Sequence, residues 1–119
     1  MQSLSSAEFV EMLRAAVPTV GPLLDEHLDE HGGLLIHLLL PELLRFAAGR
    51  FADGDVYTSS RVLEVVDRAL TEGDDQLLNA VAVSFVENVG AYPDETPEFV
   101  ATWPPALLAE HREQQTHGS

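Results

Sequence analysis

Apolar residues recur at helical spacing along most of this chain. Phe9, Leu13 and Val17 fall on one face of a helix. A serine at position 5 or 6, followed by Glu8, matches a capping box, in which hydroxyl and carboxylate accept from early backbone amides. The same periodicity continues to the carboxyl end, with proline and glycine between the segments. It predicts main helices near residues 7–17, 22–31, 34–50, 59–72, 75–89 and 105–115.

The sequence lacks the patterns of strands. No run alternates β-branched and polar residues, and isoleucine occurs once, so we expect no sheet. Segments 34–51 and 75–89 are apolar around most of their circumference, as in helices buried on all sides, so we expect these two helices to form the centre of the bundle. Pro41 lies in the first of them and predicts a kink or a break. We therefore expect an all-α fold, a compact single-domain bundle of about five to seven helices over residues 1–115, with a frayed tail at 116–119.

Short polar segments mark the expected helix ends. Asp53-Gly54-Asp55 has the composition of a turn. After it, Ser59 or Ser60 is expected to cap the next helix, because a serine hydroxyl accepts from an early amide. Asp74 or Asp75 is expected to cap the helix that follows.

The charge of the chain is strongly negative. Of its 119 residues, 20 are Asp or Glu and 6 are Lys or Arg, and the formal net charge is −14 at pH 7. Nucleic acids and anionic membranes are recognised first through basic patches, so we expect this chain to bind neither. A basic protein is the natural partner, because a negative field attracts it and accelerates association.

Cysteine and lysine are both absent from the sequence. Disulfides, thiolate catalysis, cysteine zinc sites and lysine Schiff bases are thereby excluded. The longest strongly apolar run, residues 34–40, is far shorter than the roughly 20 residues of a membrane span. The first residues lack the basic and apolar regions of a secretory signal. We expect a cytoplasmic protein with no cofactor.

His27 and His31 form the sharpest chemical pattern. Four residues apart, they share one face of the second expected helix, the spacing at which a helix offers two ligands to a tetrahedral metal. The string His27-Leu28-Asp29-Glu30-His31 also matches the inverted zinc-peptidase motif, and His37 or Glu42 could add a third ligand. The favoured alternative is an acidic helix whose two histidines border its apolar face, because such strings arise easily in an acidic chain. We therefore predict that the pair binds no structural metal.

Other catalytic patterns are missing or weak. The serines lie in no Gly-x-Ser-x-Gly or Ser-x-x-Lys context, and the glycines lack phosphate-cradling spacing. Asp53-Gly54-Asp55 begins like a calcium loop but lacks the central glycine, so it is interpreted as a turn. Arg45 and Glu87 lie in the two most apolar segments, where they either pair with each other or extend to water from helix ends.

Acidic residues gather most densely in the second expected helix. Asp25, Glu26, Asp29 and Glu30 place four carboxylates within six residues, and each like-charged pair weakens an isolated helix by about 0.2–0.5 kcal/mol. A cationic surface would relieve this repulsion on binding. These four residues are therefore the candidate partner-binding set, and an exposed side of Trp103 is the apolar alternative. The sequence also leaves a homo-oligomer open.

Two apolar stretches carry a resemblance to a known class of protein. They are LLLPELLRF at 38–46 and DQLLNAVAVSFVENV at 75–89. With the acidic helix before them and the Trp-Pro-Pro segment near the end, they resemble a small bacterial helical domain of unknown activity, similar to immunity proteins of polymorphic-toxin systems. The resemblance spans about residues 20–112. It brings no catalytic residue and implies a protein that neutralises a toxin by occluding it.

Three classes of function follow from these observations. The first is an acidic binding protein of immunity or antitoxin type, and the second is a small helical adaptor or oligomerisation module. The third is a metal-dependent hydrolase built on His27 and His31. The hydrolase ranks last, because a small helical chain without Lys or Cys offers few nucleophiles or bases. We therefore expect an inhibitor that occludes a basic protein, and not an enzyme.

Overall fold

The computed structural model describes residues 3–117, and helices dominate it. This confirms the all-α fold expected from the apolar periodicity. Extended backbone pairs at a single place in this part of the chain, where Leu4 forms a bridge to Gly73. The elements are α1 (Ser6–Ala16), a 3₁₀ turn (Pro18–Val20), α2 (Gly21–His31), α3 (Ile36–Ala52), α4 (Val56–Glu72), α5 (Asp75–Val81), a π-helical segment (Ala82–Val86), α6 (Pro97–Val100) and α7 (Pro105–His117).

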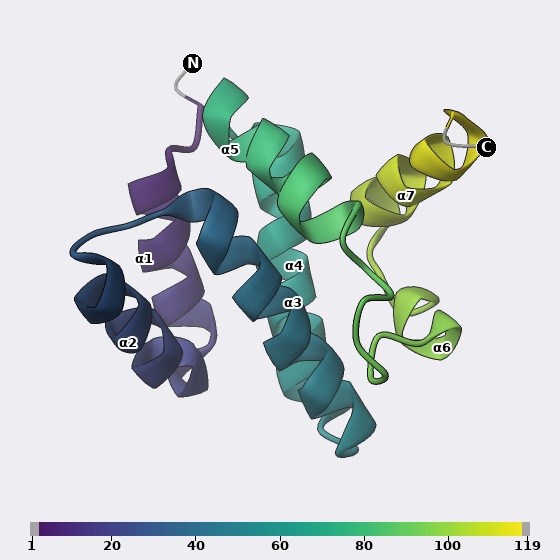
Figure 1. Ribbon diagram of the computed structural model, residues 1–119, viewed down its shortest axis with the longest axis horizontal. Helices are drawn as coiled ribbons and strands as arrows, with labels where there is room; N and C mark the ends of the chain where they lie inside the picture. The colour runs from purple at the N-terminus through teal and green to yellow at the C-terminus, as the bar shows by residue number, and fades with distance from the viewer. Residues whose placement is uncertain (1–2, 118–119) are drawn as a thin grey trace.

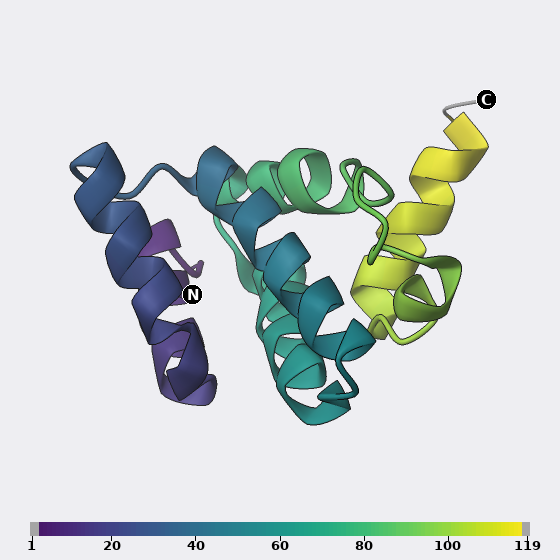
Figure 2. The ribbon, with the colours of Figure 1, turned by 60° about the horizontal axis from the view of Figure 1, so that its bottom comes forward.

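A helical hairpin occupies the centre of the molecule, and it combines the expected central segment 34–51 with α4 rather than with the segment 75–89. Helices α3 and α4 run antiparallel through the middle, joined by a short turn, and make the most extensive contact between any two elements. Helices α1 and α2 lie on one side of this hairpin, α6 and α7 lie on the other, and α5 crosses one end (Figures 1 and 2). None of the helices in residues 3–117 combines the length and apolar composition needed to cross a bilayer.

The core draws on nearly every helix. Leu77, Val81 and Phe85 are fully buried, as the periodicity of their segment predicts. Burial of this kind stabilises the fold by about 1.5–3 kcal/mol for each large apolar side chain. The largest fully buried side chains are Phe9, Phe85, Phe99, Leu13, Leu24, Leu39, Leu40, Leu43, Leu44, Leu63, Leu77 and Leu107.

Two of the expected helix starts are confirmed. The Ser5 hydroxyl accepts from the Glu8 amide at 3.1 Å, and the Glu8 carboxylate accepts from the Ser5 amide at 3.0 Å, which completes the capping box of α1. At α5, the Asp74 carboxylate accepts from the Leu77 amide at 2.9 Å. Both side chains satisfy amides that a first helical turn leaves unpaired.

The expected cap of α4 is wrong. Ser59 and Ser60 lie inside the helix, which begins three residues earlier at Val56. Asp55 is the N-cap, and its carboxylate accepts from the Thr58 amide at 3.2 Å. The reason lies in the preceding turn, where Gly54 adopts a left-handed φ of 89° and brings Asp55 to the first free amides.

Pro41 does not break α3. The helix continues through it from Ile36 to Ala52. An internal proline costs about 3 kcal/mol, but the turns around it bury Leu39, Leu40 and Leu43 completely. Three such side chains contribute more than the proline removes, so tertiary packing decides the outcome.

The helix expected over 75–89 changes its winding halfway. Helix α5 ends at Val81, and the next turn is π-helical, with the Glu87 amide bonded to the Ala82 carbonyl five residues back at 3.1 Å. The wider turn places Ser84, Phe85 and Val86 together in the buried interior. A regular α-helix turns one of three consecutive residues outward, so periodicity alone did not indicate this.

The expected frayed tail begins inside the last helix. Helix α7 continues to His117, so residues 116 and 117 are helical. Residues 118 and 119 lie outside the described part of the chain.

Candidate binding groove

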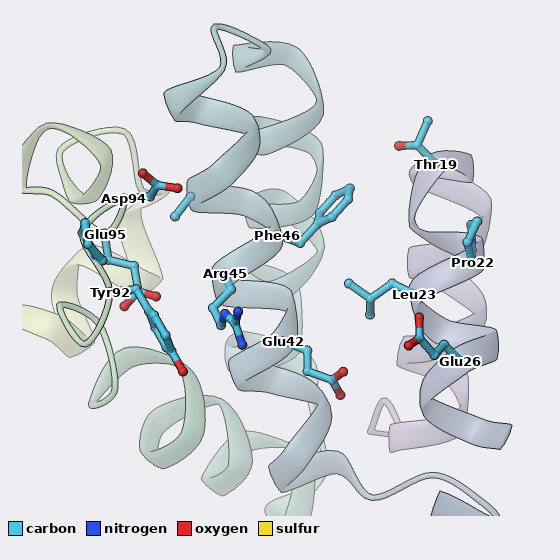
Figure 3. A pocket seen from close by; sticks show the side chains of 12 residues that line it. Thr19, Pro22, Leu23, Glu26, Glu42, Arg45, Phe46, Tyr92, Asp94 and Glu95 are labelled. Carbon is cyan, nitrogen blue, oxygen red and sulfur yellow. The ribbon is translucent and has the colours of Figure 1, made fainter. Parts of the chain in front are cut away.

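A groove of about 710 Å³ opens along the exposed face of α3. Helix α3 forms its floor with Glu42, Arg45 and Phe46, as Figure 3 shows. Leu23 and Glu26 of α2 stand on one side, and the segment 92–95, which follows the π-helical turn, stands on the other. We call this feature the α3 groove. It combines aromatic and aliphatic walls with several charged groups, as ligand-binding surfaces commonly do.

Carboxylates outnumber cations in the α3 groove. Glu26, Glu42, Asp94 and Glu95 line it, and Arg45 is the single basic residue among its lining residues. The Arg45 guanidinium carbon lies 4.4 Å from the centre of the Tyr92 ring, an ordinary cation–π distance. No ion pair involves Arg45 in the described residues. The groove is therefore a site of net negative charge.

Glu95 shapes the wall that carries Tyr92. Its side chain is buried, with one carboxylate oxygen accepting from the amides of Gly90 at 2.9 Å and Ala91 at 3.2 Å. The Glu95 amide in turn donates to the Tyr92 carbonyl at 3.0 Å. Gly90 enters this loop with a φ of 102°, a conformation that favours glycine. These bonds close the loop that carries Tyr92, whose ring contacts Arg45.

His27 fixes the other wall of the groove. It is buried, and its Nε2 accepts a hydrogen bond from the Leu35 amide at 3.1 Å. An amide can only donate, so Nε2 carries no proton and the proton of the neutral ring lies on Nδ1. Nδ1 therefore donates to Glu42 Oε2, 2.8 Å away. One imidazole thus joins α2, the linker to α3, and α3 itself.

The structure brings together the histidine pair and Glu42. Candidate ligand atoms of His27, His31 and Glu42 all lie within 4.8 Å of one another, and the two rings are 4.7 Å apart between centroids. A metal on His27 Nδ1 would move the ring proton to Nε2, where it would face the Leu35 amide donor. Both ring nitrogens are therefore committed to hydrogen bonds. The alternative third ligand, His37, lies elsewhere and contacts the Ser84 hydroxyl at 2.9 Å.

The four candidate acids of α2 are all exposed. Glu26 lines the α3 groove, whereas Asp25, Asp29 and Glu30 lie outside its lining. Asp25 pairs with Arg14 of α1 at 3.0 Å. Asp29 and Glu30 have no ion pair among residues 3–117. The structure therefore divides the set between the groove and the outer surface of α2.

The structure decides two alternatives that the sequence left open. Arg45 and Glu87 do not pair with each other but are both exposed to water, and Arg45 does so from the middle of α3, where it lies on the Tyr92 ring. Trp103 offers no exposed apolar side, since only 3% of it is accessible and its ring packs against Phe85 and Phe99. Its buried Nε1–H finds no hydrogen-bond partner in the described part of the chain.

The opposite wall of the groove was missed by sequence reasoning. Tyr92, Asp94 and Glu95 lie beside prolines and outside the helices that the sequence predicts. Gly90 was a usable signal, because a glycine that ends a helix often starts a tight loop. Nothing in the sequence indicated that this loop lies beside Arg45, which precedes Tyr92 by 47 residues.

The comparisons with known proteins identify a family without a known activity. A domain of unknown function, DUF7674, matches residues 10–118. No curated protein and no solved structure matches the chain. Because the family match covers nearly the whole chain, the protein belongs to the DUF7674 family.

Proposed function

We propose that the protein is an acidic binding protein that covers a basic surface of a protein partner, in the manner of an immunity or antitoxin protein. The observation that carries the proposal is the excess of carboxylates on the exposed face of α2 and in the adjoining α3 groove, with Glu26 belonging to both. Asp29 and Glu30 stand on that face, and Glu26 leads into the groove, where Glu42 and Asp94 follow. The chain as a whole has a net charge of −14, and its negative field would attract a basic partner.

The hydrogen bonds around the groove support binding rather than catalysis. His27 and Glu42 bond to each other, and Glu95 bonds to backbone amides, so these groups hold the two walls in place. Because these walls are already ordered in the free protein, they lose less conformational entropy when a partner binds. The groove is also open enough to accept a protruding side chain of another protein.

The test uses the product of the adjacent reading frame as the candidate partner, because inhibitors of this type are normally encoded beside their targets. The two proteins are co-purified, and the dissociation constant is measured with wild-type protein and with a variant whose four α2 carboxylates are neutralised. We expect binding to weaken about fourfold or more, because four exposed charge pairs at about 0.2–1 kcal/mol each total roughly 0.8–4 kcal/mol. The changes are Asp25→Asn, Glu26→Gln, Asp29→Asn and Glu30→Gln.

A matched control separates the effect of where the acids lie from the effect of the total charge. Four exposed acids on α4, at the start of α5 and just after the π-helical turn are neutralised instead, which changes the net charge by the same four units. We expect this control to keep most of the affinity. Equal losses in both variants, or no complex with the adjacent product, would contradict the proposed function. The control changes are Glu64→Gln, Glu72→Gln, Asp75→Asn and Glu87→Gln.

A further inference from the structure

Arg45 occupies an unusual place in the α3 groove. Four carboxylates line the same groove, yet the guanidinium pairs with none of them in the described residues and lies on the Tyr92 ring, 4.4 Å from its centre. Figure 3 shows Arg45 on the floor between Tyr92 and Glu42. The groove thus already holds one guanidinium against an aromatic ring. Its carboxylates form no ion pair with that guanidinium, so the groove keeps a net negative charge.

We propose that the α3 groove receives an arginine side chain of the basic partner, and that Arg45 occupies the Tyr92 ring when that side chain is absent. The proposal rests on the proposed function and names the group that the site recognises. The incoming guanidinium would stack on Tyr92 and bond to carboxylates such as Glu42, Glu26 or Asp94. Arg45 is exposed and has no ion pair in the described residues, so only the ring contact would be lost when it moves away.

Charge complementarity decides between a cationic and an anionic ligand. The lining carries four acids against one base, so an anion would meet net repulsion despite Arg45. A guanidinium suits the groove better than an ammonium, because it is planar, stacks on aromatic faces and donates to carboxylates in pairs. Tyr92 supplies the aromatic face, and it is half exposed and thus accessible.

The test titrates the ¹⁵N-labelled protein with N-acetyl-arginine amide and follows the amide signals of Gly90, Ala91 and Tyr92. N-acetyl-citrulline amide, which is neutral but has the same shape, and inorganic phosphate serve as comparison probes. We expect arginine amide to shift these signals with several times higher affinity than citrulline amide, and phosphate to leave them unchanged. Equal affinity for the arginine and citrulline probes would overturn the proposal, as would a phosphate shift.

Substituting Arg45 distinguishes a site for cations from a site for anions, because it should change the affinity for the ligand in opposite directions. Arg45→Met frees Tyr92 and removes the one opposing charge, so arginine amide should bind about two- to fivefold more tightly. An anion site would lose its ligand in the same variant. Unchanged or weaker binding of arginine amide would show that Arg45 is not a placeholder, and the proposal would be wrong.

Tyrosine variants test the aromatic wall. Tyr92→Leu should weaken arginine amide about two- to fivefold, and Tyr92→Phe should retain binding because the ring remains. Tyr57, a more exposed tyrosine on α4, provides the matched control, and Tyr57→Leu should have no effect. Equal effects at both tyrosines would contradict the proposal.

Failure of this proposal can be told apart from failure of the proposed function. If the adjacent product binds and depends on the four α2 acids, while the arginine probe ignores Arg45 and Tyr92, only the arginine pocket is wrong. If neither the adjacent product nor the probe binds, both are wrong.

Discussion

His27 shows how one buried polar side chain can position a binding wall. Its two ring nitrogens bond to the Leu35 amide and to Glu42, so the wall formed by α2 keeps a set spacing from the floor formed by α3. From the sequence, this residue bordered the apolar face of its helix. The sequence could not predict its hydrogen bond to the Leu35 amide, because that contact depends on how the Gly32-Gly33 linker turns back.

Replacing His27 with leucine should destabilise the fold by about 2–4 kcal/mol. The change leaves the Leu35 amide without its acceptor and removes a hydrogen bond to a carboxylate. Urea unfolding measures the free energy difference. His31→Leu is the matched control, because His31 is exposed one turn away, and it should change stability by about 0.5 kcal/mol or less. Similar losses at both histidines would show that the two hydrogen bonds of His27 contribute little.

Zinc should not stabilise the protein through His27 and His31. A metal bound at Nδ1 would place two N–H donors face to face at Leu35, which the observed hydrogen bond excludes. Melting temperatures measured with a tenfold excess of Zn²⁺ and with a chelator should agree within error. A rise in melting temperature with Zn²⁺ that disappears in both His27→Ala and His31→Ala would establish a metal site and contradict this prediction.

At the scale of elements, local rules located the helices better than their ends and winding. The caps at Ser5 and Asp74 use residues that accept from amides three positions on, so they could be recognised from sequence. The cap at Asp55 and the π-helical turn could not. The first depends on the left-handed Gly54, and the second on a turn that buries three residues in succession.

The cap of α4 should make stability depend on pH. Hydrogen bonds from the Thr58 side chain and amide, together with the nearby Arg50 guanidinium, hold the pKa of the Asp55 carboxyl below its ordinary value. A depressed pKa means that this stabilisation is present above about pH 4, the usual range for Asp, and is lost as the pH falls through the folded-state pKa. The difference in melting temperature between wild type and Asp55→Ala should therefore narrow in acid.

The neutral cap of α6 provides the comparison for this prediction. The Thr96 hydroxyl accepts from the Phe99 amide at 3.2 Å and does not titrate. The difference between wild type and Thr96→Ala should stay nearly constant between pH 7 and pH 3. If the Asp55→Ala difference were equally constant, ionisation of Asp55 would have no part in capping α4.

The π-helical turn should be among the most sensitive places in the core. Phe85 is fully buried there and packs against Trp103, with the ring centroids 5.5 Å apart. Phe85→Ala should cost about 3–5 kcal/mol in unfolding free energy. Val83 lies two residues away and is half exposed, so Val83→Ala should cost much less, about 1 kcal/mol or below. A loss below about 1 kcal/mol for Phe85→Ala would mean that this segment is peripheral.

At the scale of the whole molecule, the sequence alone predicts the charge but not the groove. The net charge of −14 and the density of acids in α2 follow from composition alone, and they remain the basis of the proposed partner. The α3 groove needs a contact between distant parts of the sequence, since residues 92–95 meet the consecutive helices α2 and α3 only in the folded chain. Local periodicity carries no information on that meeting.

The central claim is that the acids of α2 and the α3 groove attract a basic partner. The most direct measurement is the association rate constant with the adjacent gene product at low and physiological salt, for wild type and for a variant with lysine at positions 25, 26, 29 and 30. We predict a rate that falls steeply with salt in the wild type and is at least about tenfold slower in the variant at low salt. Rate constants that are equal in the two proteins and insensitive to salt would contradict the account.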